Sequence, residues 1–285
     1  MNIAIIGGDL RQVYAARILS AHQHRVSIFC PAAKVAEAKE SDDPIDTVKD
    51  ADAVLLPIPA CGIGGAIRGT TDLSPSALLP ALSPGCRLFG GNLSAAIVAS
   101  ARERKIKTVD YLNLESFVLQ NAYLTAQAAL GILLTELESC LFRTKIAVIG
   151  FGRIGKFLTR MLTSLGAEVT VFARKSSDLA MASLLRVRTL PIASLGERKA
   201  LMPFRVVINT APARILKSED LFCLADGSVI VELASGSDNI PELPAGKSIR
   251  LLVAQGLPGK CFPESAGEIV AHATEEALSL LSESP

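Results

Sequence analysis

The sequence has only three histidines, no pair of cysteines in a C-x-x-C arrangement and no run of like charge. Its six cysteines are scattered, as is typical of reduced thiols in a core, and no H-E-x-x-H pattern occurs. We therefore expect no zinc or other metal site. Lysine and arginine total 29 against 28 acidic residues, so the charge balance excludes the basic footprint of a nucleic-acid-binding protein and a polybasic membrane patch.

The sequence predicts neither a secretory signal peptide nor a membrane span. The first ten residues, MNIAIIGGDL, carry no basic residue before a short apolar run that soon reaches two glycines, so they predict a strand. The most apolar longer stretch, residues 117–134, is interrupted by polar side chains at Gln120, Asn121, Thr125 and Gln127. We expect a cytoplasmic protein.

The composition is that of a folded protein with a large core. The chain has 285 residues, of which 49% are hydrophobic, which suits one large or two medium domains and excludes disorder. A mean hydropathy of +0.38 favours association through a buried apolar patch, so we expect a homo-oligomer.

An internal repeat is the most informative feature. Residues 145–150 resemble residues 2–7, which lie 143 positions earlier in the chain. Residues 169–172 resemble residues 26–29 at the same separation of 143 positions. Between the two strands of each copy lies a segment with apolar residues at helical spacing. Continuous apolar strands that alternate with amphipathic helices indicate parallel sheets buried on both faces. The sequence therefore predicts an α/β fold of two Rossmann-like, doubly wound domains, with further strands at 53–57, 87–90, 107–110, 187–190, 205–209, 228–232 and 249–253.

The second copy carries a dinucleotide-binding fingerprint, G-x-G-x-x-G, that closes a strand and opens a helix. Its first glycine permits the tight turn, the second lets the backbone approach a diphosphate, and the third lets helix and strand pack closely. Free N–H groups at the helix start would receive the anion. The candidate residues are Gly150, Phe151, Gly152, Arg153, Ile154 and Gly155.

Two further segments of this domain are candidates for the coenzyme. Where an acidic residue would bind the ribose of NAD, the next strand ends in basic and hydroxyl residues, Arg174, Lys175 and Ser176, which suit a 2′-phosphate and favour NADP. The alternative is a solvated loop. The segment Asn209, Thr210, Ala211 and Pro212 leaves a strand as a loop under the nicotinamide would, although a simple proline turn has the same sequence.

The first copy has lost the fingerprint, because Asp9 and Gln12 replace its second and third glycines. A carboxylate would repel a diphosphate and Gln12 would obstruct close packing, so we expect no dinucleotide there. The helix start, with Asp9 as its cap and Arg11 in its first turn, remains a candidate site for a small anion. The alternative is that Asp9 only caps the helix and Arg11 is a surface charge. The glycine-rich loop at 61–69 is either a flexible lid over a ligand site or a mobile surface loop with no functional role.

Several of these segments together resemble the family of dipicolinate synthase A subunits, over nearly the whole chain. The fingerprint is common among dehydrogenases, but its combination with the opening G-G-D-x-R-Q and the late L-P-G-K is far more specific. The segments are residues 7–12, 149–156, 173–177, 208–212, 232–235 and 256–260.

The resemblance implies a cytoplasmic, NADP-dependent oxidoreductase of a spore-forming organism. Such an enzyme makes dipicolinate (pyridine-2,6-dicarboxylate) from a dihydro- or hydroxytetrahydrodipicolinate precursor, together with a flavoprotein-like B subunit. It also implies an N-terminal substrate domain, residues 1–120, joined by a C-terminal helix at 263–285, and an NADP domain at 121–262. A cleft would separate the domains, and crossing helices, one beginning near Thr125, would link them.

The sequence departs from the family pattern at three places. Gln127 replaces an acidic residue before the crossing helix, residues 236–238 replace a proline and two glycines, and Glu264 stands where a basic or neutral residue is usual. We therefore interpret the chain as a divergent member.

The implied substrate carries two carboxylates, which cations and helix N-termini recognise. The candidates are Arg11, Arg68 and Lys260, with Asp9 at the helix start and Asn92 as a neutral donor; each could equally be a solvated surface residue. Oxidation to an aromatic ring is strongly favoured, so orientation matters more than a potent base. No catalytic acid or base is identified, and a lone His272 is typical of packing.

Two other functions stay open. The chain could be an NADP-binding protein without turnover of its own, a scaffold or redox-sensing partner. It could also be another NADP-dependent dehydrogenase of hydroxy or amino acids, although these usually rely on a histidine paired with an acid, and no such pair is legible.

Overall fold

The computed structural model describes residues 1–197, 199–236 and 239–282 as two compact units. The first comprises residues 1–121 and the segment from Pro258 onward, and the second comprises residues 122–257. The second unit thus ends five residues before the expected boundary at 262. As a result, Pro258 to Lys260 belong to the first unit.

The first unit is built on a six-stranded parallel sheet in the order β3-β2-β1-β4-β5-β6. Its central strands are continuous apolar runs, and Ile3 to Ile6 of β1 are all buried because helices cover both faces. The strands are β1 (Asn2–Ile6), β2 (Arg25–Phe29), β3 (Lys39–Ser41), β4 (Ala53–Leu55), β5 (Arg87–Gly90) and β6 (Lys107–Asp110).

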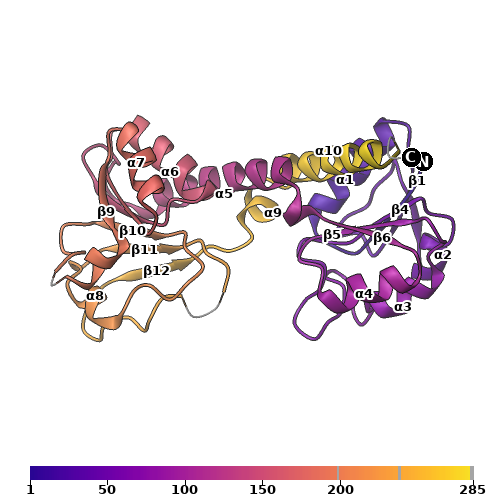
Figure 1. Cartoon of the computed structure of the whole chain (residues 1–285), viewed down its shortest axis with the longest axis horizontal. Coiled ribbons are helices and arrows are strands. Elements are labelled where there is room, and N and C mark those ends of the chain that lie inside the picture. The colour runs from indigo at the N-terminus through magenta and orange to yellow at the C-terminus, as the bar shows by residue number, and fades with distance from the viewer. Residues whose placement is uncertain (198, 237–238, 283–285) are drawn as a thin grey trace. The chain divides into compact units, whose positions relative to one another are not determined.

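Helices lie on both faces of this sheet (Figure 1). One face is covered by α1 (Leu10–Ala21) and α10 (Pro263–Ser282), which pack extensively against each other. The other is covered by α2 (Pro44–Val48), α3 (Pro75–Leu78) and α4 (Ala95–Glu103). A core cluster between the sheet and this second group of helices includes Val54, Leu56, Leu78, Leu88 and Ala101.

The second unit repeats the design with the order β12-β11-β10-β7-β8-β9, again all parallel. Ala147 and Ile149 of β7 and Phe172 of β8 belong to its core cluster. The strands are β7 (Lys145–Ile149), β8 (Glu168–Ala173), β9 (Arg188–Pro191), β10 (Val206–Asn209), β11 (Val229–Glu232) and β12 (Arg250–Val253). The helices are α6 (Arg153–Ser164), α7 (Ser176–Leu184) and α8 (Ser218–Phe222), joined to the first unit through α5 (Glu115–Glu136) and α9 (Leu257–Cys261).

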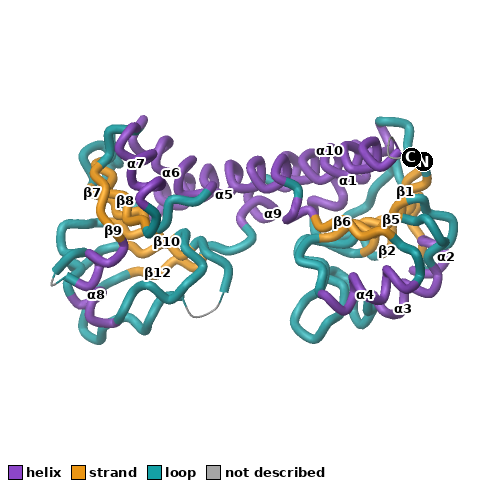
Figure 2. Tube along the Cα trace, in the orientation of Figure 1, coloured by secondary structure: helices purple, strands orange, loops and turns teal. Residues whose placement is uncertain are grey.

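Figure 2 shows the strands of each unit gathered between helices. Numbered along the chain within each unit, the strands lie side by side in the same order, third-second-first-fourth-fifth-sixth. This is the order of a dinucleotide-binding fold, and the strand order reverses between β1 and β4 and between β7 and β10. Ligands of such sheets bind where the carboxyl ends of these strands diverge. The prediction of two Rossmann-like parallel-sheet domains is confirmed.

The helix expected to begin near Thr125 begins ten residues earlier, at Glu115. Gln127 is therefore an exposed residue in the middle of α5, and it does not start a helix. By length and composition alone α5 is long and apolar enough to cross a membrane, and 44% of its most apolar window is buried inside the protein. Ala126, Ala129 and Leu133 are among its buried residues.

Gly131 weakens α5 without an evident packing reason. It lies inside the helix, and a Cβ built on it would meet no atom within 4 Å. Because glycine pays a larger entropic cost in a helix than alanine, we expect Gly131→Ala to stabilise the second unit by about 1 kcal/mol. Urea unfolding would measure this gain, and an unchanged or lower midpoint would contradict it.

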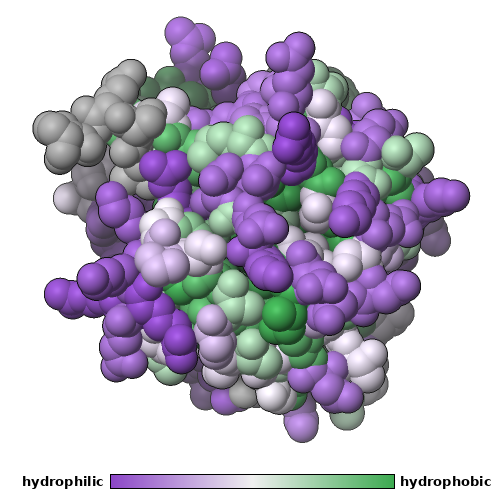
Figure 3. Space-filling view, turned by 90° about the vertical axis from the view of Figure 1, so that its right-hand side faces the viewer, coloured by the Kyte–Doolittle hydropathy of each residue, from purple (hydrophilic) through white to green (hydrophobic). Residues whose placement is uncertain are grey.

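Figure 3 looks onto the first unit and shows hydrophilic side chains around smaller groups of hydrophobic ones. This mixed surface accords with the near-equal numbers of basic and acidic residues.

Candidate functional site

The fingerprint turn joins β7 to α6 at the carboxyl edge of the second sheet. Gly150 has φ +93°, a conformation that only glycine adopts easily, and its N–H donates to the Phe172 carbonyl at 2.8 Å. A Cβ on Gly155 would collide with the Gly150 carbonyl oxygen, so this glycine lets the helix approach the strand closely. Both glycines are required by the local backbone.

The start of α6 is open. Its N-cap residue is Gly152, no side chain caps the helix, and a Cβ built on Gly152 would meet nothing within 4 Å. The first turn of α6 therefore carries the positive end of the helix dipole without a side-chain cap. Phosphate oxygens are suitable partners for such a helix start. Phe151 is buried, and Ile154 is half-buried in the first turn.

The equivalent turn of the first unit is filled by the protein itself. The Gly8 N–H donates to the Arg68 carbonyl at 2.7 Å, and Asp9 caps α1 by accepting from the Arg11 N–H at 3.0 Å. The buried Gln12 side chain folds back and accepts from the Asp9 N–H at 3.0 Å. Hydrogen-bonding groups that would receive a diphosphate are thus occupied, which agrees with the loss of the fingerprint glycines.

The basic corner lies beside the open turn. Strand β8 ends at Ala173 next to β7, with Ile149 opposite Phe172, so the segment after β8 emerges at the same edge as the fingerprint. Arg174, Lys175 and Ser176 are all exposed there. Exposed cations and a hydroxyl at this place can contact the adenosine end of a bound dinucleotide.

The segment after β10 is held by internal hydrogen bonds. The Asn209 side chain is buried, donates to Glu232 Oε2 at 2.7 Å and accepts from the Ala211 N–H at 3.2 Å. Thr210 Oγ1 donates to the Ile149 carbonyl at 3.0 Å. Asn209 and Thr210 therefore shape the loop, and their side chains are engaged within the protein. Pro212 is exposed and Ala211 half-buried.

Glu232, which was not a candidate residue, organises this region. Burial raises the pKa of its carboxyl, although hydrogen bonds from Asn209, Ala234 and Asn239 partly oppose that shift. In the sequence, Glu232 could have been identified from segment 232–235, which is one of the segments that resemble dipicolinate synthase A subunits. Of the altered loop at 236–238, residues 237 and 238 lie outside the described part of the chain.

Three candidate substrate residues meet at the carboxyl edge of the first sheet. Arg11 is 9% exposed, and its guanidinium donates to both carboxylate oxygens of Asp9 at 2.9 and 2.8 Å and to the Ile58 carbonyl at 2.7 Å. Arg68 is close enough to Asp9 to help lower its pKa. The Arg11 side chain is therefore buried and already paired, which excludes the interpretation of a surface charge.

The other two candidates, Lys260 and Asn92, are exposed. Gly259 lies against the Asp9–Arg11 pair, since a Cβ there would come within 2.6 Å of Arg11 Nε, and Lys260 follows directly. Asn92 has φ +55°, and its N–H donates to Asp110 Oδ1 at 3.1 Å. Asp110 and the Ile58 carbonyl were not identified from the sequence, because their partners are backbone groups or residues distant along the chain.

The glycine-rich loop has a fixed stem and an open tip. Gly62 N–H donates to the Ala66 carbonyl at 2.9 Å, and Arg68 N–H donates to the Ala60 carbonyl at 3.1 Å. At the tip, Ile63 is fully exposed and Gly64 has no atom near its Cβ position. The tip can therefore move without breaking the stem.

No group of three or more potential metal-ligating side chains occurs in the part of the chain that the structure describes. The three histidines gather away from the candidate residues. His22 Nδ1 lies 2.8 Å and His24 Nε2 3.2 Å from Glu275 Oε1, and the His272 ring lies 6.3 Å from that of His22. This cluster joins the C-terminal end of α1 to α10, so it lies at the opposite edge of the sheet from the start of α1.

Two Rossmann-like units, one with an open fingerprint turn and one with a closed turn, define the class of two-domain, dehydrogenase-like proteins. The family model for the N-terminal domain of the dipicolinate synthase A subunit matches residues 2–112. The dipicolinate synthase A subunit of Bacillus subtilis (strain 168) is 26% identical over 293 aligned positions, which cover 98% of this chain and 96% of the relative. The chain is therefore similar to dipicolinate synthase A subunits, by the family model over its N-terminal part and by the Bacillus subtilis relative over nearly its whole length.

Solved structures show the same similarity. The A chain of dipicolinate synthase from Bacillus subtilis superposes with a TM-score of 0.83 at 25% identity, covering 99% of this chain and 97% of that one. The corresponding protein from Bacillus halodurans shares the fold, with a TM-score of 0.82 at 23% identity, covering 100% and 98%. An L-alanine dehydrogenase, at 15% identity, 99% and 90% coverage and a TM-score of 0.67, shares the fold as well.

Proposed function

We propose that the chain is an NADP-dependent oxidoreductase that forms dipicolinate from a dihydrodipicolinate or hydroxytetrahydrodipicolinate precursor. It would act in the cytoplasm during sporulation, and its partner would be a flavoprotein-like B subunit. The observation that carries the proposal is the contrast between the two turns: the α6 start has no side-chain cap, whereas the α1 start is capped by Asp9. Of the two equivalent turns, the one that opens α6 is the one without a side-chain cap, and its helix start is suited to a diphosphate.

The residues around the open turn fit NADP. Gly152 would let the diphosphate approach the backbone, and Arg174, with Lys175 and Ser176, would contact the 2′-phosphate. NADP supplies a hydride acceptor, so that a dihydropyridine gives the aromatic dicarboxylate, NADPH and one proton. The hydroxylated precursor would first have to lose water.

In the first unit, the exposed cations Arg68 and Lys260 are suited to bind the substrate carboxylates. Arg11 has a different role in the proposal, because its guanidinium is already shared between Asp9 and the Ile58 carbonyl. It would hold the shape of the site. Asn92 is exposed and can donate a neutral hydrogen bond.

The position of the histidines argues against a hydroxy-acid dehydrogenase that uses a histidine–acid pair. His22 and His24 do contact Glu275, but at the end of α1 that lies away from Asp9 and Arg11. A pair at that edge of the sheet is remote from the carboxyl ends of the strands, where ligands bind.

Replacement of Arg174 tests the choice of coenzyme. We expect Arg174→Ala to weaken NADPH binding at least about tenfold and to leave NADH binding unchanged, because one charge-assisted contact to the 2′-phosphate is worth about 1.5–3 kcal/mol. The chain has no tryptophan, so NADPH fluorescence gives a simple titration. Arg160→Ala, at an exposed position on α6, is the matched control. Equal losses for NADPH and NADH would contradict the assignment to the 2′-phosphate.

Turnover separates the enzyme from a protein that only binds the coenzyme. Purified chain is incubated with the precursor and NADP, with and without the B subunit, and NADPH is followed by its absorbance. Steady formation of NADPH and dipicolinate supports the proposal. NADP binding without turnover under both conditions would indicate a non-catalytic role.

A further inference from the structure

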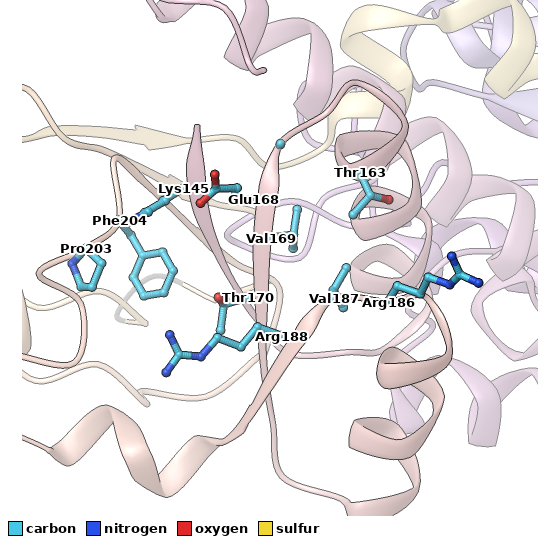
Figure 4. Close-up of a pocket in the computed structure, with 11 residues that line it drawn as sticks. Lys145, Thr163, Glu168, Val169, Thr170, Arg186, Val187, Arg188, Pro203 and Phe204 are labelled. Carbon is cyan, nitrogen blue, oxygen red and sulfur yellow. The ribbon is translucent and has the colours of Figure 1, made fainter. Parts of the chain in front are cut away.

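A pocket of about 390 Å³ lies at the amino ends of β7, β8 and β9, at the opposite edge of the second sheet from the fingerprint turn (Figure 4). Lys145 and Glu168 begin neighbouring strands and lie opposite each other, as do Thr170 and Arg188. Because alternate residues of a strand share a face, these four side chains gather on one face of the sheet. Pro203 and Phe204 form part of the wall.

The pocket is basic. Among the described residues that line it, Lys145, Arg186 and Arg188 are cationic and Glu168 is acidic. All four are exposed, and within the described chain they make no ion pair with one another. In Figure 4, Arg186 and Arg188 extend in opposite directions from the start of β9, so the positive charge is spread across the opening.

Apolar side chains border the same edge. Phe142 is 61% exposed and contacts Gly166, in the turn that leads into β8, and the Arg143 guanidinium lies 5.2 Å from the Phe142 ring centroid. Leu165, in the same turn, is 45% exposed. Leu184, the last residue of α7, lies two residues before Arg186 and is 76% exposed. We call these residues and the pocket the basic apolar edge.

We infer that the basic apolar edge is the docking surface for an acidic, partly apolar face of the partner subunit. Arginine and aromatic side chains are enriched at protein interfaces, and the exposed leucines beside them add apolar area that a partner would bury. A small anion alone would leave Phe142 and Leu184 in water. The edge lies opposite the fingerprint turn, so a partner bound there would leave the coenzyme site of this unit accessible.

A second copy of this chain fits the edge less well. Two-fold pairing through this surface would bring two edges of the same net charge together, each with four cations (Arg143, Lys145, Arg186 and Arg188) and one carboxylate, Glu168. Like charges in such a contact repel, whereas an acidic partner would be attracted and its association accelerated. The charge of the edge therefore favours a different protein.

The inference rests on the proposed function only in taking the B subunit to be the partner. Affinity of the full-length chain for the purified B subunit is measured by calorimetry at low and high NaCl. We expect Arg186→Glu combined with Arg188→Glu to weaken binding at least about 30-fold, Leu184→Ser to weaken it about tenfold, and NaCl to weaken the wild-type complex.

The matched control is Arg102→Glu combined with Arg104→Glu, which has the same spacing on an exposed part of the first unit. It should bind the B subunit with the affinity of the wild type. NADPH affinity, measured on every variant, should stay unchanged, which shows that the second unit is folded and tests the coenzyme site independently.

Three results would overturn the inference. The first is that the wild-type chain does not bind the B subunit. The second is that the variant with Arg186→Glu and Arg188→Glu binds the B subunit with an affinity within twofold of the control variant. The third is that the wild-type chain sediments as a homodimer and that this variant sediments as a monomer. In each case NADPH affinity and turnover show separately whether the proposed oxidoreductase activity stands.

Discussion

Gly152→Ala should fold as stably as the wild-type chain and bind NADPH about 100-fold more weakly, a loss of about 2.8 kcal/mol. The methyl group would meet no protein atom within 4 Å, so the substitution costs the fold little. The same methyl group would project at the N-cap of α6, into the space where the diphosphate must approach the helix N–H groups. A fluorescence titration with NADPH, alongside a urea unfolding curve, measures both quantities.

Gly155→Ala provides the contrast. Its methyl group would collide with the Gly150 carbonyl and crowd Thr210 Oγ1, so helix α6 must move away from β7. We expect this variant to lose stability and NADPH binding together, whereas Gly152→Ala loses binding alone. NADPH binding that survives in Gly152→Ala would contradict the assignment of the diphosphate to this turn.

Much of the fold could be predicted because the strands are continuous apolar runs. Residues 87–90 and 107–110 were predicted with the bounds that β5 and β6 have in the structure. Strand β3 was missed because Lys39–Ser41 is a short, polar edge strand that pairs with β2 and has no apolar run of its own. The early part of α5 was missed as well, since the polar residues at 120 and 121 interrupt its apolar pattern.

The candidate site was predictable where its chemistry depends on local spacing. The turn at 150–155 needs particular residues at particular backbone positions, and the sequence shows them directly. Contacts between distant main-chain groups leave no such trace. The Arg68 carbonyl that closes the turn at Gly8 and the Ile58 carbonyl that binds Arg11 belong to a loop about 50 to 60 residues further along the chain.

Asp9→Ala should lower the free energy of unfolding of the first unit by about 3 kcal/mol. The change removes the N-cap of α1, worth about 1 kcal/mol, and also the carboxylate that pairs with the buried Arg11 guanidinium. The second loss is smaller than for a fully buried pair, because the Asp9 side chain is 45% exposed. Urea unfolding gives the difference.

Asp43→Ala is the matched control, since Asp43 caps α2 in the same way, accepting from the Ile45 N–H at 2.7 Å, but no ion pair to Asp43 is described. We expect it to cost only about 1 kcal/mol. Equal losses for the two variants would show that the Asp9–Arg11 pair adds nothing beyond the cap. Replacing both partners, with Asp9→Ala and Arg11→Met, should cost less than Asp9→Ala alone, because no buried guanidinium is then left unpaired.

The same pair should give the stability a defined pH dependence. Burial acts to raise the pKa of Asp9, but hydrogen bonds and charge from Arg11, with a contribution from Arg68, hold it below the usual 3.8. A carboxyl whose pKa is lower in the folded state stabilises the fold above its unfolded pKa, and this contribution is lost as the pH falls through the folded value. The stability difference between wild type and Asp9→Asn should therefore be constant at neutral pH and shrink below pH 3.8. A difference that shrinks already between pH 7 and pH 5 would mean that another group controls it, since Asp9 stays ionised throughout that range.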